Sequence, residues 1–325
     1  MFSGNNVPSS VQSQGNDVLI PHYSTKIYTE LFFCKTKTVY TSLLYDWLTV
    51  RQSKCNIYNK IHNNKDFADM IIKVDNTKIN RFEQLCCAEH VFGSRSLTAL
   101  AAYGTEHDVH KFWIITENDR DVAALHLNGQ VLTVIKENMI GTEDIISLTK
   151  EFEIHEIDSD WDLCEKLHAL LGGFTESSYY MVYNGGSVDG DFDDIKPADL
   201  QDVYSVLQQS HEYYRTHLKY EPWASHLESC IKTGRTEVYQ LERDGKPVGT
   251  GSIISQDDSH AAIAAVAVIP EYRLKGLGSY ITNFLVKEIL KKGKTPCLIS
   301  GYDEVAELYK KIDFITVGRW GELYI

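Results

Sequence analysis

The stretch "VAVIPEYRLKGLGSYITNFL", residues Val266–Leu285, places a short basic, glycine-rich turn between an apolar strand and an apolar helix. Pro270 ends the strand, because proline has no backbone N–H to donate to a neighbouring strand. The helix that follows begins with amides that lack internal acceptors and carry partial positive charge. Gly276 and Gly278 let a ligand approach the backbone closely. We therefore predict that Arg273, Lys275 and the amides of this turn bind a pyrophosphate.

Two other phosphate-binding motifs fit this stretch poorly. The GxxxxGK[ST] pattern of a P-loop is absent from the chain. A dinucleotide fingerprint needs a third glycine where Ile281 stands, and a carboxylate after the next strand, "TPCLIS", which has none. The remaining alternative is a tight strand-to-helix turn with no ligand.

Length and charge limit the classes of protein. A chain of 325 residues predicts about two domains. A formal net charge of −13 disfavours binding to nucleic acid or to an anionic membrane, and it attracts cationic substrates such as amines. The seven cysteines are scattered and odd in number, with no CxxC pair. They indicate reduced, buried thiols in a cytoplasmic protein, and they predict no metal site.

The N-terminal part of the chain predicts a helical region followed by strands. Residues 1–20 have the composition of a disordered lead, and 27–93 are mainly helical by periodicity. The short strands "FWIIT", "VAALHL" and "QVLTVI" follow, with a hairpin at Asn128-Gly129. A helix at 142–152, a strand, a second helix and the strand "SYYMVYN" close this part.

The C-terminal part repeats this order after a glycine-rich, acidic linker. Helices come first, then a hairpin at Asp244-Gly245, a buried strand, the helix 276–292, a strand, a helix and closing strands. We predict a domain at 21–184, a linker at 185–194 and a second domain at 195–325. The corresponding N-terminal segment, "KENMIGTED", has no basic glycine pair, so we expect it to bind no anion.

Two motifs resemble those of the GNAT superfamily of N-acetyltransferases. The segment "AAVAVIPEYRLKGLGSYI" is similar to its acetyl-CoA motif, V-x-P-x-x-[RQ]-x-x-G-x-[GA]. The segment "AELYKKIDF" resembles the second signature, with Asp313 where the family has glycine. The resemblance covers about residues 192–325. The whole chain looks like two-domain bacterial GNAT proteins with a degenerate first half, and its closing segment resembles the FR-type, glycine acyltransferase-like subgroup.

The resemblance implies a fold and a set of ligand contacts. The implied fold is α/β: a tandem GNAT-like (acyl-CoA N-acyltransferase) fold with a mixed central sheet flanked by helices. The strand would hold the pantetheine arm, and the turn would hold the pyrophosphate. Asp303, just before the second signature, would add a further contact with the cofactor. The implied cofactor-binding residues are Val266, Ala267, Val268, Arg273, Leu274, Lys275, Gly276, Leu277, Gly278, Ser279 and Asp303.

The resemblance also implies a catalytic acid. Tyr309 matches the family tyrosine that protonates the departing CoA thiolate, a role that suits a phenol. The alternative for Tyr309 is a core aromatic at helical spacing.

The sequence identifies the general base and the residues that contact the acceptor less specifically than it identifies the anion turn. Many relatives use a carboxylate on the central strand, but "AAIAAVAV" has none. The start of that strand offers Asp257, Asp258 and His260 instead. The preceding helices offer an aromatic, acidic wall suited to an amine through cation–π contacts, or alternatively an ordinary solvated helix face. The candidate acceptor residues are His211, Glu212, Tyr213 and Tyr214.

Together these observations predict an acetyltransferase. The expected reaction moves the acetyl group of acetyl-CoA to a primary amine, with a small molecule favoured, by direct attack in a ternary complex. Acetyl-CoA and an amine are the expected partners, without a metal. One alternative is a CoA-binding regulatory or interaction module without turnover, and another is an enzyme that uses a longer acyl-CoA.

Overall fold

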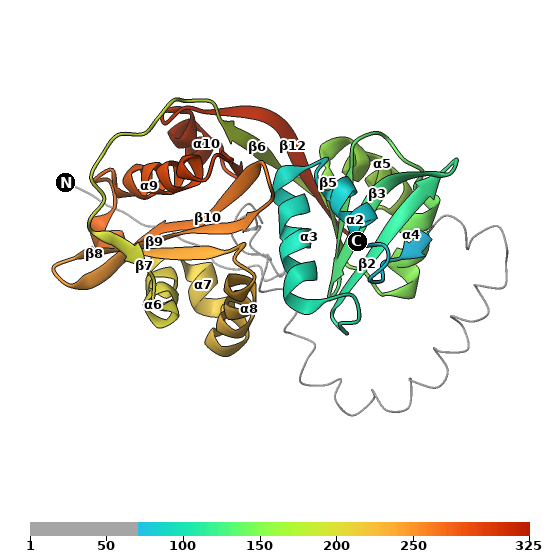
Figure 1. Ribbon diagram of the computed structural model, residues 1–325, viewed down its shortest axis with the longest axis horizontal. Coiled ribbons are helices and arrows are strands. Elements are labelled where there is room, and N and C mark those ends of the chain that lie inside the picture. Colours follow the sequence, from blue (N-terminus) through green and yellow to red (C-terminus); the bar gives the residue numbers. More distant parts are fainter. Residues whose placement is uncertain (1–70) are drawn as a thin grey trace, which may run out of the picture.

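A single continuous sheet organises the computed structural model, which describes residues 71–325 (Figure 1). The predicted lead at 1–20, the first part of the predicted helical region, Cys34 and Cys55 lie outside the described residues. The twelve strands of the sheet follow the order β1-β2-β3-β4-β5-β12-β6-β11-β10-β9-β8-β7. Among the described helices, none is both long and apolar enough to span a membrane.

The N-terminal half is defined here as residues 71–183 and the C-terminal half as residues 195–325. The N-terminal half comprises β1 Ile71–Lys73, α2 Ile79–Cys86, α3 His90–Tyr103, β2 His110–Glu117, β3 Arg120–Asn128, β4 Val131–Lys136, α4 Glu143–Glu151, β5 Glu156–Asp160, α5 Trp161–Leu171 and β6 Phe174–Tyr183. The C-terminal half comprises β7 Ile195–Pro197, α6 Leu200–Ser210, α7 Glu212–His217, α8 Tyr220–Lys232, β8 Glu237–Arg243, β9 Lys246–Gln256, β10 His260–Val268, the short 3₁₀ helix Pro270–Tyr272, α9 Leu277–Lys291, β11 Thr295–Ser300, α10 Asp303–Lys310 and β12 Phe314–Tyr324.

Both halves use the same topology. Each has antiparallel strands, then one helical crossover between two parallel strands: α4 joins β4 to β5, and α9 joins β10 to β11. The other strand pairs of the sheet are antiparallel. The predicted repeat of topology is confirmed, and so is the mixed α/β sheet flanked by helices.

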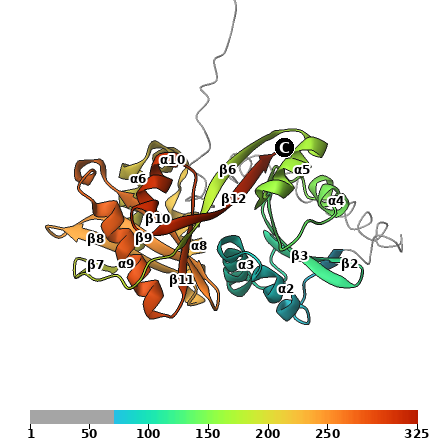
Figure 2. The same cartoon turned by 90° about the horizontal axis from the view of Figure 1, so that it is seen from above.

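The two halves exchange their last strands. Strand β6 belongs to the N-terminal half by sequence, yet it pairs with β11 of the C-terminal half. Strand β12 ends the C-terminal half, yet it pairs with β5 of the N-terminal half. The two exchanged strands also pair with each other over most of their length, and Figure 2 shows them running side by side between the halves. The exchange makes one sheet out of two repeats.

Helices cover both faces of the C-terminal strands. In Figure 1, α9 and α10 lie on one face, and α6, α7 and α8 lie on the other. A core that includes Leu285 and Ile289 of α9 fills the first face. A second core, which includes Trp223 and Leu227 of α8, fills the opposite face. The turn between β10 and α9 therefore projects from a scaffold packed on both sides.

Helix α3 fastens the N-terminal half to the C-terminal half. The ring of Phe92 stacks on that of Trp320, with centroids 3.7 Å apart. The buried hydroxyls of Ser94 and Ser255 lie 2.7 Å apart. Apolar side chains from α3, β10 and β11 form one buried cluster around these contacts. Burial of this helix against β10, β11 and Trp320 of β12 gives the two halves a second contact, in addition to the strand pairing of β6 and β12.

Two expectations from the sequence are corrected by the structure. Residues 71–73, assigned to the helical region, form strand β1 and pair with β2, because three residues are too few for periodicity to separate strand from helix. Cys87, expected to be buried, is exposed beside the buried Cys86. Residues 184–194 contain no helix or strand.

A cluster of histidines lies where α3, β2, β3 and α8 meet. His110 Nδ1 lies 3.0 Å from His126 Nε2, and the hydroxyl of Tyr103 lies 2.5 Å from His226 Nδ1. Burial lowers the pKa of His110 to about 4, with a further contribution from the charge of His107. Burial lowers the pKa of His226 to about 3. These imidazoles are neutral in the folded protein at neutral pH.

This cluster predicts acid-sensitive folding. An unfolded histidine binds a proton below about pH 6.5, whereas folded His110 does so only near 4. The unfolded state therefore binds more protons in this window, and stability is lost as pH falls through it. The unmodified protein should lose unfolding free energy as the pH falls from roughly 7.5 to 5. In His110→Gln this loss should be smaller by about 2 kcal/mol, as measured by urea denaturation at each pH. His155→Gln, at an exposed histidine, is the control and should show the same loss as the unmodified protein. An equal loss in the unmodified protein, His110→Gln and His155→Gln would contradict the role assigned to His110.

Candidate functional site

The turn predicted to bind an anion begins α9 without a side-chain cap. Gly276 is the N-cap residue, with a φ of 77° and no side chain to accept from the helix amides. Leu274, two residues earlier, also has a positive φ of 60°, and its side chain is fully exposed. Left-handed backbone at these two positions directs the chain sharply from the 3₁₀ helix into α9. The left-handed backbone of Leu274, which is unusual for a residue with a side chain, was not apparent from the sequence.

The amides of the first helical turn are open. Among the described residues, no acceptor is recorded for the amides of Leu277, Gly278 and Ser279, whereas Tyr280 already donates to the Gly276 carbonyl at 3.0 Å. Gly278 is not at a positive φ, and a Cβ built there would meet nothing within 4 Å. Neither backbone geometry nor internal packing therefore requires glycine at 278. A ligand that approaches these amides closely would require it.

The corresponding turn of the N-terminal half carries carboxylates where the C-terminal half carries cations. Glu117 Oε1 accepts from the Gly141 amide at 2.7 Å, and Glu143 Oε2 accepts from the Thr142 amide at 2.9 Å. Burial, together with these two acidic neighbours, raises the pKa of Asp144. Three carboxylates at the start of α4 repel a phosphate. The first-turn amides of α4 likewise have no acceptor among the described residues, so the two repeats differ here in charge: cations lie before α9, and carboxylates lie at the start of α4.

The two cations of the turn fold back onto the main chain. Arg273 Nε donates to the Val268 carbonyl at 3.0 Å, and its Nη2 donates to the Ser210 carbonyl at the end of α6. Lys275 Nζ donates to the Glu271 carbonyl at 3.0 Å and lies 4.8 Å from the ring of Tyr272. Both side chains remain exposed. They add positive charge beside the open amides, and Arg273 also ties the strand end to α6.

Strand β10 separates from β11 before it reaches the turn. The parallel pairing covers only residues 260–262, while the antiparallel pairing with β9 continues to Val268. The β9 register shifts between Ala264 and Ala267, and Ala265 has a φ of 54°, an unusual value for a residue with a side chain. The predicted contact residues Val266, Ala267 and Val268 therefore lie on a strand whose β11-facing edge has no strand partner within residues 71–325. The bulge at Ala265 was not apparent from the sequence.

Tyr309, the predicted acid, lies in the core. Its side chain is 6% exposed, and its ring centroid lies 5.7 Å from that of Phe314 in an edge-to-face contact. Asp303 begins α10, is exposed, and accepts from the Tyr179 hydroxyl at 2.8 Å. Asp313 has a φ of 65°, so it adopts the left-handed backbone for which the family signature uses glycine. Aspartate tolerates this conformation better than most residues do.

The four acceptor-side candidates occupy different environments. His211 lies between α6 and α7, and its Nδ1 accepts from the Tyr213 amide at 3.1 Å. Burial and the nearby charge of Arg273 lower the pKa of His211. Glu212 is exposed and lies 3.6 Å from the guanidinium of Arg215. Arg273 of the anion turn donates to the carbonyl of Ser210, the residue before His211, and so joins this segment to the turn.

The tyrosines of this segment are packed to different degrees. Tyr214 is 3% exposed and belongs to the core beneath α6 and α8. Tyr213 is half-buried and stacks on His217 with ring centroids 4.4 Å apart. Tyr214 is thus a packing residue, which leaves Tyr213 as the tyrosine nearer the surface.

The candidate bases at the start of β10 lie far from the turn. His260 is the first residue of the nine-residue strand, which spans roughly 27 Å at 3.3 Å per residue. Asp257, just before it, is buried and bonded to residues around it. These side chains form a separate cluster with α3 rather than part of the site at the turn.

Comparison with known proteins finds one family model that matches within the C-terminal half. Residues 200–314 match the model of the Acetyltransferase (GNAT) family. No curated protein matches the chain significantly. A tandem GNAT protein from the clavulanic acid biosynthesis pathway is 11% identical, with a TM-score of 0.54 over 78% of this chain and 96% of its own. A Drosophila protein is 13% identical, with a TM-score of 0.53 over 78% of this chain and 98% of its own.

A further structure matches over a shorter span. A GNAT-family protein from Novosphingobium aromaticivorans is 15% identical, and the chain covers 64% of its length, with a TM-score of 0.38 that is too low to define the fold. The two longer matches, at this low identity, support the tandem GNAT fold and nothing finer. They agree with the repeated topology of the sheet.

The open turn predicts a selective loss of ligand binding. Gly278→Asp places a carboxylate in open space where we expect the pyrophosphate, so the variant should fold normally. Like charges in contact cost several kcal/mol, so we expect at least a ~100-fold loss of CoA affinity by titration calorimetry. Gly186→Asp is the matched control, because a side chain there also meets open space, but in the linker. Unchanged CoA affinity in Gly278→Asp would refute the anion site.

Proposed function

We propose that the chain is an N-acetyltransferase that uses acetyl-CoA, from the premise that residues 200–314 match the model of the Acetyltransferase (GNAT) family. Its acceptor is a primary amine, with a small molecule favoured over a protein. The reaction proceeds by direct attack within a ternary complex. The N-terminal half is a degenerate repeat that supports the C-terminal half and binds no CoA.

The observation that carries this proposal is the open first turn of α9. Its amides lack acceptors among the described residues, and the glycine at 278 has no internal reason to be glycine. In the other repeat, Glu117 and Glu143 accept from the amides of Gly141 and Thr142, just before the helix, and Asp144 adds a third carboxylate. This contrast supports a diphosphate ligand in the C-terminal half, because the fold is shared while the charge is opposite.

The edge of β10 suits the rest of the ligand. Beyond Ala262 this edge has no strand partner, so its backbone groups are available to the amide-bearing pantetheine arm. The arm would extend from the turn along Val268 and Val266 toward the bulge at Ala265. The acyl end then lies near the middle of the strand, on the side from which α6 and α7 approach.

The reaction requires two proton movements. Acetyl-CoA supplies the thioester whose acyl group is transferred. The amine nitrogen forms a bond to the carbonyl carbon, the carbon–sulfur bond breaks, and the amine loses one proton while the sulfur gains one. We assign sulfur protonation to Tyr309, whose phenol matches the family signature. His211, neutral because of burial and of Arg273, lies on the acceptor side.

The charge of the chain favours a cationic acceptor. The formal net charge is −13, so an ammonium ion is attracted to the protein. Glu212 and Tyr213 supply a carboxylate and an aromatic face on the acceptor side. A panel of amines, read by release of free CoA thiol, identifies the acceptor.

Two alternatives have specific motivations. A CoA-binding module without turnover is motivated by the absence of a carboxylate on β10 and by Asp313 in place of glycine. It predicts CoA binding without thiol release for any amine. A longer acyl donor is motivated by the glycine acyltransferase-like closing segment. It predicts that longer acyl-CoA thioesters outcompete acetyl-CoA in the same assay.

Replacement of the proposed acid separates catalysis from packing. Tyr309→Phe keeps the ring that contacts Phe314 and removes only the hydroxyl, so the fold should be preserved. We expect kcat to fall about 100-fold, while the dissociation constant for acetyl-CoA changes less than about twofold. Steady-state kinetics and titration calorimetry measure the two quantities. A kcat equal to that of the unmodified chain would make Tyr309 a packing residue, with water as the proton donor.

A further inference from the structure

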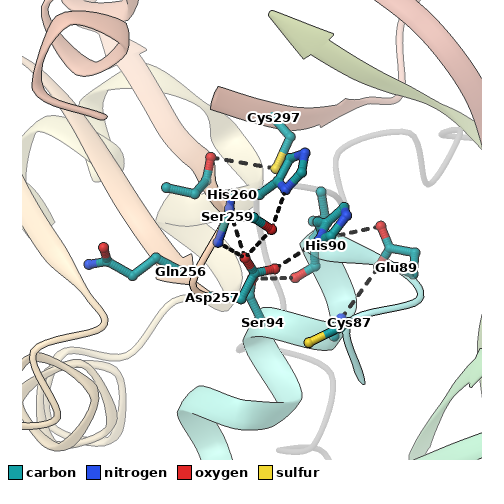
Figure 3. A network of polar contacts seen from close by, with 12 residues as sticks. Cys87, Glu89, His90, Ser94, Gln256, Asp257, Ser259, His260 and Cys297 are labelled. Carbon is teal, nitrogen blue, oxygen red and sulfur yellow. Dashed lines mark hydrogen bonds and ion pairs between the residues drawn. The ribbon is translucent and has the colours of Figure 1, made fainter. Parts of the chain in front are cut away.

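Three potential metal ligands meet where the two halves touch. His90 is the first residue of α3, Asp257 directly follows β9, and His260 is the first residue of β10. One donor atom from each lies within 4.8 Å of the other two. Figure 3 shows the three side chains gathered between the helix and the hairpin. The sequence predicted no metal site, because the histidine at 90 is distant in sequence from the other two residues.

The carboxylate of Asp257 is held in one orientation by its own turn. Its Oδ1 accepts from the amides of Ser259 and His260, each at 2.7 Å, and from the Ser259 hydroxyl at 3.0 Å. The side chain is buried. Its other oxygen, Oδ2, lies 2.9 Å from His90 Nδ1. One oxygen is thus fully engaged by donors, and the second points toward α3.

The two imidazoles lie face to face beside this oxygen. The ring centroids of His90 and His260 are 3.5 Å apart, and the ring planes differ by 11°. Burial and the neighbouring His90 lower the pKa of His260. Burial alone would raise the pKa of Asp257, but hydrogen bonds from His90 and the turn amides hold it well below its ordinary value. Metal ions bind these forms, the neutral imidazole and the ionised carboxylate.

We propose that His90, Asp257 and His260 bind one divalent transition-metal ion of the Zn²⁺ class. Two imidazole nitrogens and one carboxylate oxygen form a set that suits Zn²⁺, Co²⁺ or Ni²⁺ and does not suit Ca²⁺ or Mg²⁺. Three protein ligands leave one tetrahedral position for water. The side chain of His90 is 26% exposed, which gives the ion a route from solvent. The backbone donors to Asp257 orient this ligand from behind.

The ion would act as a clamp rather than as part of acyl transfer. His90 belongs to the N-terminal half, while Asp257 and His260 belong to the C-terminal half. The site is at the opposite end of β10 from the anion turn, so the two sites are independent. A metal ion that binds only the folded chain stabilises it by mass action. The proposal therefore does not rest on the acetyltransferase assignment.

Metal binding by the full chain tests the proposal directly. The protein is freed of metal with EDTA and dialysed. Zn²⁺ affinity is then measured by competition with a chelating dye, and bound metal is counted by mass spectrometry. We expect one Zn²⁺ per chain, and a melting temperature that rises with Zn²⁺. Bound Co²⁺ should give the strong visible absorption of a tetrahedral site.

Substitutions assign the binding to this cluster. His90→Gln and His260→Gln should each weaken Zn²⁺ binding at least ~100-fold and abolish the Zn²⁺-dependent rise in melting temperature. Asp257→Asn keeps an oxygen for the turn amides and removes the ligand oxygen, so it should lose the ion while it retains the hairpin. His155→Gln, at an exposed histidine, should bind Zn²⁺ normally.

Two results would overturn the proposal. One is a metal-free chain that takes up less than one Zn²⁺ or Co²⁺ at micromolar concentration. The other is affinity that survives His90→Gln and His260→Gln when circular dichroism shows both variants to be folded. Either result would leave the cluster as a hydrogen-bonded contact between α3 and the hairpin.

Discussion

The exchange of β6 and β12 is the constraint on which the rest of the structure depends. A strand at the edge of a sheet exposes unpaired amides and carbonyls, and each half alone would have such an edge beside β5 or β11. Exchange pairs these edges with strands from the other half and makes one sheet of twelve strands. Neither half retains its full set of strand partners without the other. The orientation of β11 relative to β10, and hence the divergence that opens the edge of β10, is set from both halves.

Two copies of one topology have acquired opposite electrostatic character at the same position. The start of α9 has glycine at its cap and cations in the preceding turn, with amides that lack acceptors among the described residues. Before α4, Glu117 and Glu143 accept from the amides of Gly141 and Thr142, and the turn has carboxylates in place of cations. The topology is shared, but the two turns differ in backbone, with a φ of 77° at Gly276 and −108° at Thr142, as well as in the charge of their side chains. This explains how one repeat can bind an anionic ligand while the other serves as scaffold, joined to it through α3 and the exchanged strands.

Local features of the sequence predicted most of the fold. Asp244-Gly245, with positive φ at both residues, marks a hairpin that the structure contains, and the apolar spacing of α9 predicts its buried face. The motif around Gly276 predicted a strand, a turn and a helix in the observed order. The positive φ of Asp313 follows from its place in the family signature.

Non-local features could not be predicted in this way. The partner of each closing strand is decided by pairing between residues more than a hundred positions apart. The alternation of side chains along β6 and β12 is compatible with either partner. The three residues of β1 are too few to show a period. The contact of His90 with Asp257 joins residues 167 positions apart, so no spacing motif contains both. The bulge at Ala265 contains no glycine, so the sequence does not indicate a positive φ there.

Amide hydrogen exchange of the full chain, with and without saturating CoA, tests the central claim that only the C-terminal repeat has an anion site. The account predicts slower exchange in residues 263–279, which cover the open edge of β10 and the first turn of α9. It predicts no change in residues 136–144, where the carboxylates of Glu117, Glu143 and Asp144 would repel the phosphates. Unchanged exchange at 263–279, or protection at 136–144 instead, would contradict it.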